Sequence, residues 1–284
     1  MKKVSASVFV IALALAGCGS SSASESGSSR SVSVSQTSEQ VELVIFAAAS
    51  MTESLEEIQT IYETTNSNIK ITYNFESSGT LKTQIENGAE CDVFISAAPK
   101  QMNQLDITQD EEKNPDRLDM VDPDTRINLL ENKVVLVVPE DNPLEIEGFD
   151  DLADKLQNET ILFAMGNSDV PVGQYTQKIF TYYSLDEEQL ANDGKITYGS
   201  NVKDVVSYVR ESSAGAGVVY ATDAFSGNLT IIDTATKDMC GQVIYPAAVL
   251  KNSAHAEEAK AYLDYLQSDE AMEIFEKIGF SKPE

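Results

Sequence analysis

The sequence predicts an α/β protein with mainly parallel sheets and helices on both sheet faces. Apolar stretches of strand length alternate with amphipathic stretches of about 8 to 15 residues, as in folds built from βαβ units. Several of these strands end in serine, glycine or other small residues directly before a helix. A chain of 284 residues is also long enough for two lobes of ordinary domain size, each with its own core.

The first strand–helix unit begins at residue 41. Residues 41–47 are apolar except for Glu42, and small residues then lead into Ser50, after which a helical pattern begins at once. Ser50 and Glu53, three residues apart, match the capping-box pattern of a helix N-terminus. The free N–H groups and the dipole of such a turn suit an anion, although an ordinary capped helix would have the same sequence.

The alternation continues to the end of the chain. Further strands are predicted at 69–75, 92–96, 133–138, 160–164, 217–220 and 243–250, and helices at 81–87, 149–156, 174–183, 203–211, 254–267 and 269–277. Serine and glycine at 77–79 and a polar turn at 166–173 repeat the strand–turn–helix arrangement of the first unit. The acidic stretch 105–126 is expected to be a solvated surface loop.

The N-terminus predicts a targeting segment outside the fold. Lys2 and Lys3 precede an apolar run, 4–16, that is too short to be a permanent membrane span. The run ends in Leu-Ala-Gly-Cys18, which resembles the lipobox of bacterial lipoproteins. That resemblance implies a signal peptide at 1–17, diacylation of Cys18 and a serine-rich tether at 18–40, with a plain secretory signal and a chance cysteine as the alternative.

Charge and cysteine content limit the classes of protein to which this chain can belong. The net charge is −26 and no long basic stretch offsets it, so nucleic acid is not an expected partner. Cys91 and Cys240 remain beside Cys18. Outside the cytoplasm they could form a disulfide or remain two free thiols, and the sequence leaves both alternatives open.

Residues suited to catalysis are scarce. The single histidine, His255, lies in a polar stretch and is expected to be exposed at a helix start. The sequence has no nucleophile elbow, P-loop or GxGxxG motif, and no cluster of histidine, cysteine or paired carboxylates for a transition metal. We therefore expect no enzyme activity, no cofactor and no cation site.

The strand–helix junctions instead supply neutral hydrogen-bond donors. These donors are Ser50, Ser77, Ser78, the backbone amides near Val172 and Val202, and Tyr220. In doubly wound sheets such junctions lie at the carboxyl ends of the strands, where ligands bind. A site without lysine or arginine can hold a fully ionised oxyanion and reject protonated ones, whose hydrogen would find no acceptor.

Blocks of the chain resemble, in the same order, the molybdate-binding proteins of ABC transporters. The blocks are Phe-Ala-Ala-Ala-Ser-Met-Thr at 46–52, Ser-Ser-Gly-Thr-Leu at 77–81, Asp-Val-Phe-Ile-Ser-Ala at 92–97, the strand at 132–139, Val-Pro-Val-Gly-Gln-Tyr at 170–175, Gly-Val-Val-Tyr-Ala-Thr-Asp-Ala at 217–224 and Tyr-Pro-Ala at 245–247. The resemblance covers roughly residues 41–280. It implies a two-lobed periplasmic-binding-protein fold (type II), each lobe a doubly wound mixed sheet, with lobe one at 41–131 plus 243–284 and lobe two at 132–242.

The resemblance also implies a ligand and the residues that hold it. Ser50 and Ser78 would donate from hydroxyl and backbone N–H groups, Val172 and Val202 from backbone N–H groups, and Tyr220 from its phenol. The family commonly has alanine where this chain has Val172, which could tighten the pocket. The chain would then be a monomeric, lipid-anchored extracytoplasmic protein that captures molybdate, and also tungstate, and delivers it to an ABC transporter permease.

Three other interpretations of the sequence stay open. The same fold could bind sulfate, phosphate or another tetrahedral oxyanion. It could also serve as a sensor or surface lipoprotein that signals to a partner rather than feeding a transporter. A hydrolase is disfavoured because no nucleophile–base pair is evident in the sequence.

Overall fold

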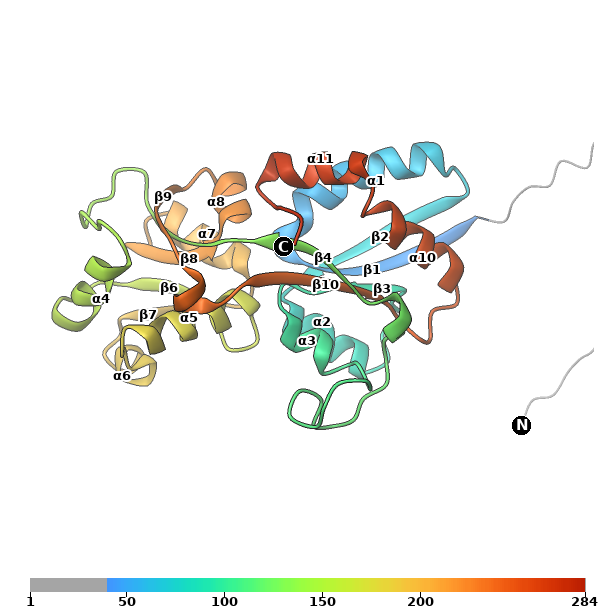
Figure 1. The fold of residues 1–284 in the computed structure, drawn as a ribbon. Coiled ribbons are helices and arrows are strands. Elements are labelled where there is room, and N and C mark those ends of the chain that lie inside the picture. Colours follow the sequence, from blue (N-terminus) through green and yellow to red (C-terminus); the bar gives the residue numbers. More distant parts are fainter. Residues whose placement is uncertain (1–39, 284) are drawn as a thin grey trace, which may run out of the picture. The chain divides into compact units, whose positions relative to one another are not determined.

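The computed structural model describes residues 40–283 (Figure 1). The predicted signal peptide, Cys18 and nearly all of the predicted tether lie outside these residues. Residues 39–284 group into one compact unit that holds two mixed sheets of five strands each. No helix in the described range is long and apolar enough to cross a membrane.

The first sheet begins with the predicted strand–helix unit. Its strands, in spatial order, are β2 (Ile69–Glu76), β1 (Val41–Ala48), β3 (Val93–Ile95), β10 (Val243–Val249) and β4 (Ile127–Asn132). The helical elements that belong with it are η1 (Ala49–Met51), α1 (Thr52–Thr65), α2 (Ser78–Glu86), α3 (Pro99–Asn103), η2 (Pro123–Thr125), α10 (Ala256–Tyr265) and α11 (Asp269–Ile278). We call this sheet with its helices lobe one. Figure 1 shows α1, α10 and α11 on one face of the sheet and α2 and α3 on the other.

The second sheet is built from the middle of the chain. Its strands, in spatial order, are β7 (Ile196–Gly199), β6 (Phe163–Gly166), β8 (Ala216–Tyr220), β5 (Val134–Val138) and β9 (Thr230–Thr234). Its helices are α4 (Phe149–Asn158), α5 (Pro171–Tyr182), α6 (Glu187–Asn192), α7 (Val202–Arg210), α8 (Ala221–Gly227) and α9 (Lys237–Cys240). We call this sheet with its helices lobe two. The chain passes from β4 to β5 at Lys133 and returns to β10 after α9.

The sheets contain more antiparallel pairing than the alternation of strands and helices predicts. β1 pairs in parallel with β2 and β3, and β6 with β7 and β8. β10 and β5, however, are antiparallel to both of their neighbours. Each sheet is therefore mixed, because a strand that arrives from the other lobe enters it in the opposite direction.

Some elements begin or end elsewhere than predicted, or are not apparent from the sequence. Strands β4, β7 and β9 lie at sheet edges, where alternation of apolar and polar residues is weak. Helix α5 begins at Pro171 rather than at Gln174, since proline at the first helical position needs no N–H partner. Cys91 and Cys240 are both buried and free, so the alternative of a disulfide between them is wrong.

Candidate functional site

All five residues predicted as oxyanion donors line one small cavity. Its full lining is Ala48, Ala49, Ser50, Glu76, Ser77, Ser78, Ala97, Val170, Pro171, Val172, Val202 and Tyr220. These residues follow or end β1, β2 and β3 in lobe one and β6, β7 and β8 in lobe two. The cavity thus lies at the carboxyl ends of parallel strands from both sheets, where doubly wound folds bind ligands.

Ser78 is held so that its hydroxyl proton is free to donate. The Ser78 side chain is fully buried, and its Oγ accepts a hydrogen bond of 3.0 Å from the backbone N–H of Ala97. Ser78 is the first residue of α2, and Ser77 caps that helix by accepting from the Thr80 N–H. The backbone N–H of Ser78 therefore belongs to the first turn, which has no partner within the helix.

Ser50 reaches the cavity by a different route from the one the sequence predicts. The predicted capping box with Glu53 is wrong, because a 3₁₀ turn, η1, follows β1 and moves the start of α1 to Thr52. The Ser50 Oγ instead lies 2.9 Å from the phenol oxygen of Tyr245. Glu53 turns outward to an ion pair with Lys203.

Lobe two contributes two helix N-termini to the cavity. Val172 is the second residue of α5, after Pro171, and Val202 is the first residue of α7. Asn201 caps α7 by accepting from the N–H groups of the two residues that follow Val202, and leaves the Val202 N–H unused. First-turn amides of this kind, together with the helix dipoles, favour an anion.

Tyr220 lies at the end of β8 with its ring fully buried. Its phenol donates a long hydrogen bond of 3.4 Å to the Ala97 carbonyl of lobe one. Burial raises the pKa of this phenol well above its usual value, so Tyr220 stays a neutral donor. The Tyr220 phenol already reaches across the cavity from lobe two, so it could donate to a ligand between the lobes instead of to the Ala97 carbonyl.

Two further contacts join the lobes around the cavity. Lys203 Nζ of lobe two lies 2.8 Å from a carboxylate oxygen of Glu53 in lobe one. Gly79, the second residue of α2, packs so closely on lobe two that an added Cβ would lie 2.2 Å from the Asp169 carbonyl oxygen. The structure is thus a closed arrangement of the two lobes.

Asp223 is a buried carboxylate beside this contact. Its side chain is fully buried, and Lys203 Nζ lies 3.3 Å from one of its oxygens without a well-oriented hydrogen bond. Burial raises the pKa of Asp223 to about 6, although the Lys203 charge acts in the opposite direction. The folded protein therefore favours the protonated form of Asp223 relative to the unfolded chain.

This shift predicts a pH-dependent gain in stability for Asp223→Asn. A carboxyl group whose pKa rises on folding contributes stability below its unfolded pKa, and that contribution is lost as the pH rises through about 6. The free energy of unfolding of the variant, relative to that of wild type, should increase by up to about 3 kcal/mol as the pH rises from 4 to 7.5. Urea unfolding at both pH values measures this, with Asp264→Asn as an exposed control. A stability difference independent of pH would contradict the prediction.

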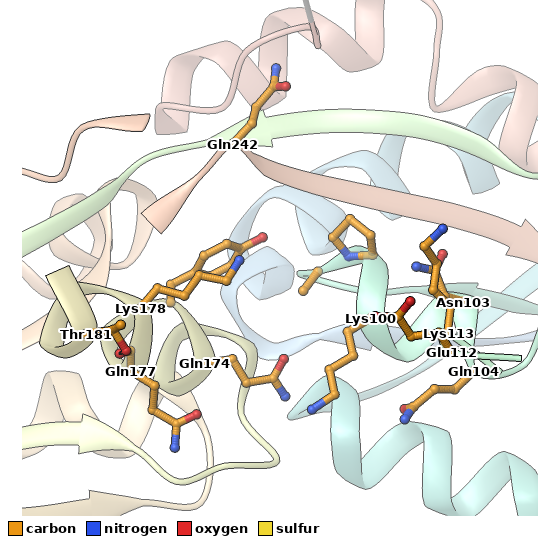
Figure 2. Close-up of a pocket in the computed structure, with 13 residues that line it drawn as sticks. Lys100, Asn103, Gln104, Glu112, Lys113, Gln174, Gln177, Lys178, Thr181 and Gln242 are labelled. Atoms are coloured by element: carbon orange, nitrogen blue, oxygen red, sulfur yellow. Dashed lines mark hydrogen bonds between the residues drawn. The ribbon is translucent and has the colours of Figure 1, made fainter. Parts of the chain in front are cut away.

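A larger cleft of about 620 Å³ adjoins the cavity, since Ala98 lines the cleft and Ala97 the cavity (Figure 2). Figure 2 shows Lys178 and Gln174 entering it from α5 of lobe two and Lys100 from α3 of lobe one. Lys113 and Glu112 are its other charged lining residues. The cleft therefore carries three lysines against one glutamate, in a chain whose net charge is −26.

The sequence did not single out every residue that shapes the site. Tyr245 belongs to a quoted motif, but nothing in the sequence shows that its phenol meets Ser50, which is 195 residues away. Ala97 follows a predicted strand and bonds Ser78 only through its backbone. Glu76 could have been noticed, since it directly precedes the serine pair at the end of β2.

Among the described residues, no group of three or more histidine, cysteine, aspartate or glutamate side chains is placed to hold a metal ion. His255 is the N-cap residue of α10 and lines a separate surface pocket beside Asp92. The residues around the cavity are hydroxyls, amides and small apolar groups, with one carboxylate, Glu76. Such a set can bind an anion but offers no nucleophile–base pair.

Comparison with known proteins agrees with this arrangement. Residues 43–281 match the family model described as bacterial extracellular solute-binding protein. YvgL of Bacillus subtilis, which is assigned as an ABC transporter substrate-binding lipoprotein, is 39% identical over 86% of this chain and 88% of its own length. The molybdate-binding protein ModA of Escherichia coli is 31% identical over 86% of this chain and 90% of its own length.

The fold is similar to that of a solved protein as well. The periplasmic molybdate-binding protein of Azotobacter vinelandii superposes with a TM-score of 0.71, covering 85% of this chain and all of that one, at 19% identity. At that identity the likeness shows the two-lobed fold alone. The family match over most of the chain shows that this protein belongs to the bacterial extracellular solute-binding proteins.

Proposed function

We propose that this protein binds molybdate, and also tungstate, in the cavity between Ser50, Ser78, Val172, Val202 and Tyr220, and delivers it to an ABC transporter permease. The observation that carries the proposal is the convergence of hydroxyl and helix N-terminal donors from both lobes on one buried cavity. The ligand named for the Escherichia coli relative, molybdate, is an oxyanion of the kind that such donors would hold.

Binding would require a hinge movement and no covalent chemistry. The cavity has a volume of only about 10 Å³, at most what one water molecule needs. A tetrahedral oxyanion is larger, so the lobes must part to admit it and then close over it. Lobe closure excludes water, which strengthens each bond from a neutral donor to the charged ligand.

The donor set also explains how a strongly acidic chain can bind an anion. Affinity would come from fixed local dipoles, while the overall negative field acts mainly on association and is screened by salt. Diacylation of Cys18 would hold the protein at the outer face of the membrane, near the permease, as a monomer. The relative YvgL bears the description lipoprotein, which supports this placement.

Calorimetric titration of residues 39–284, the compact unit, tests the proposal. Calorimetry suits a chain without tryptophan. We expect sub-micromolar 1:1 binding of molybdate and tungstate and no heat from sulfate or phosphate. Binding of sulfate or phosphate instead would favour the alternative oxyanion receptor, and silence from all four anions would remove the function while leaving the fold.

The lysines that line the larger cleft should increase the association rate of the anion. Replacing Lys100, Lys113 and Lys178 with glutamine should slow molybdate association about 10-fold at low salt, because local positive potential steers an anion toward the cavity beside it. Dissociation should not change, since these side chains do not line the cavity. Stopped-flow competition at several salt concentrations measures both rates. The same three-charge change at Lys70, Lys260 and Lys277 is the control, and an equal effect there would contradict local steering.

A further inference from the structure

A chain of buried hydrogen bonds leads from Ser50 through Tyr245 to Asn132. The Ser50 Oγ lies 2.9 Å from the Tyr245 phenol oxygen, which lies 3.2 Å from the Asn132 Nδ2. All three side chains are buried, with Tyr245 at 0% exposure. The chain also joins the lobes, because Asn132 ends β4 and its Nδ2 donates to Thr222 of α8 in lobe two.

The direction of each proton in this chain is fixed at the Asn132 end. The Asn132 Oδ1 accepts a hydrogen bond of 2.8 Å from the backbone N–H of Lys133. That contact sets which end of the amide is the NH₂ group. The two Nδ2 hydrogens then go to the Thr222 hydroxyl, at 3.0 Å, and to the Tyr245 phenol. An amide nitrogen can only donate, so the Tyr245 oxygen must accept there.

Tyr245 then keeps its own proton for donation, and Ser50 Oγ is positioned to accept it. A buried phenol whose proton has no acceptor is costly, and Ser50 Oγ lies 2.9 Å from the Tyr245 oxygen, where it can accept that proton. Burial also raises the pKa of Tyr245 well above its usual value, which keeps that proton in place. A serine oxygen that accepts from Tyr245 has its own proton left to donate into the cavity.

We infer that Asn132 and Tyr245 form a positioning relay that occupies one acceptor lone pair of the Ser50 hydroxyl and directs its proton to the ligand. The Ala97 N–H acts in the same sense on Ser78. Each of these two serines of lobe one then has one lone pair occupied and its hydroxyl proton left to donate to the ligand. A ligand oxygen that carries hydrogen, as in hydrogen phosphate, would meet a hydroxyl proton at either serine, whereas molybdate and tungstate carry no hydrogen when fully ionised.

This inference rests on the proposed oxyanion function and deepens it, and Tyr245→Phe tests it. The variant keeps the ring, which packs on Tyr220 and Phe280, and removes only the phenol oxygen. The freed Ser50 oxygen could then accept from a protonated ligand. We expect molybdate affinity to fall about 2- to 12-fold and hydrogen phosphate to bind no less tightly than in wild type. The selectivity ratio, which is the affinity for molybdate divided by that for hydrogen phosphate, should therefore decrease.

A double-mutant cycle separates the relay from a general structural effect. If Tyr245 acts through Ser50, Tyr245→Phe should change molybdate affinity less than about 2-fold in a Ser50→Ala background. Tyr262→Phe is the matched control, because its buried phenol bonds Tyr73 at 2.5 Å in lobe one and does not line the cavity. It should leave both affinity and selectivity unchanged.

Calorimetry and competition titrations on residues 39–284 measure these quantities, with ligand-free thermal melts to confirm folding. Additive losses in the double mutant, or equal losses for molybdate and hydrogen phosphate, would overturn the relay while the proposed function stands. A wild-type protein that binds no oxyanion would overturn the proposed function and the relay together. A narrowed selectivity ratio with a non-additive cycle would support the relay.

Discussion

Gly79→Ala should weaken molybdate binding about 5- to 150-fold while leaving both sheets folded. The added Cβ would lie 2.2 Å from the carbonyl oxygen and 2.9 Å from the Cβ of Asp169, across the interface between the lobes. Overpacking of this kind costs about 1–3 kcal/mol, and here only the closed arrangement would carry the cost. In the open protein the same alanine should stabilise α2, by up to about 1 kcal/mol, because alanine is the better helix former.

The opposite signs of these two effects make the prediction specific. Calorimetry gives the affinity for molybdate, and thermal unfolding without ligand gives the stability. Thr83→Ala, on the exposed side of the same helix, is the control and should change neither the affinity nor the closure of the lobes. Unchanged affinity in Gly79→Ala would mean that the lobes of the bound protein do not approach each other at α2.

Ser78→Ala should weaken molybdate binding about 10- to 150-fold. The change removes a hydroxyl donor to a charged ligand, a hydrogen bond that contributes about 1.5–3 kcal/mol. It also leaves the buried Ala97 N–H without the acceptor that holds it 3.0 Å from the Ser78 Oγ. Ser50→Ala should have an effect of similar size, since Ser50 lines the same cavity from the neighbouring strand end.

Ser54→Ala separates loss of a ligand donor from loss of a buried hydroxyl. Ser54 is as buried as the two site serines, but its hydroxyl donates to the Met51 carbonyl within the same chain segment and does not line the cavity. This variant should lose some stability and keep its affinity. Unchanged affinity in both Ser50→Ala and Ser78→Ala would show that the anion binds elsewhere.

The sequence predicts the repeated strand–turn–helix units well because their signals are local. Apolar strands of buried parallel sheets, small residues at their ends and proline or serine at helix starts all appear within a few residues of one another. The donors Ser50 and Ser78 follow from these junctions. The junctions indicated amides near Val202, but only the family resemblance selected Val202 itself, because a donor that acts through its backbone N–H can have any side chain.

The capping box at Ser50 shows where local reasoning fails. The sequence matches the capping-box pattern, but the 3₁₀ turn η1 comes between β1 and α1, and the Ser50 hydroxyl bonds Tyr245 instead. Glu53 is drawn to Lys203 of the other lobe, 150 residues away. The long-range Ser50–Tyr245 contact is favoured over the local capping box because an unpaired hydroxyl is costly where the Ser50 and Tyr245 side chains are buried. Glu53 remains partly exposed and does not need the capping contact.

By itself the sequence determined the α/β class, the places where strands give way to helices, and the neutral character of the donors there. These properties depend on residue type and short-range periodicity. Only the tertiary structure decided that β5 and β10 enter their sheets antiparallel, that Cys91 and Cys240 stay apart, and that Ser50, Tyr245 and Asn132 share one chain of buried hydrogen bonds. These features join residues far apart in the chain, and their free energy comes from burial and packing that exist only once the lobes have folded together.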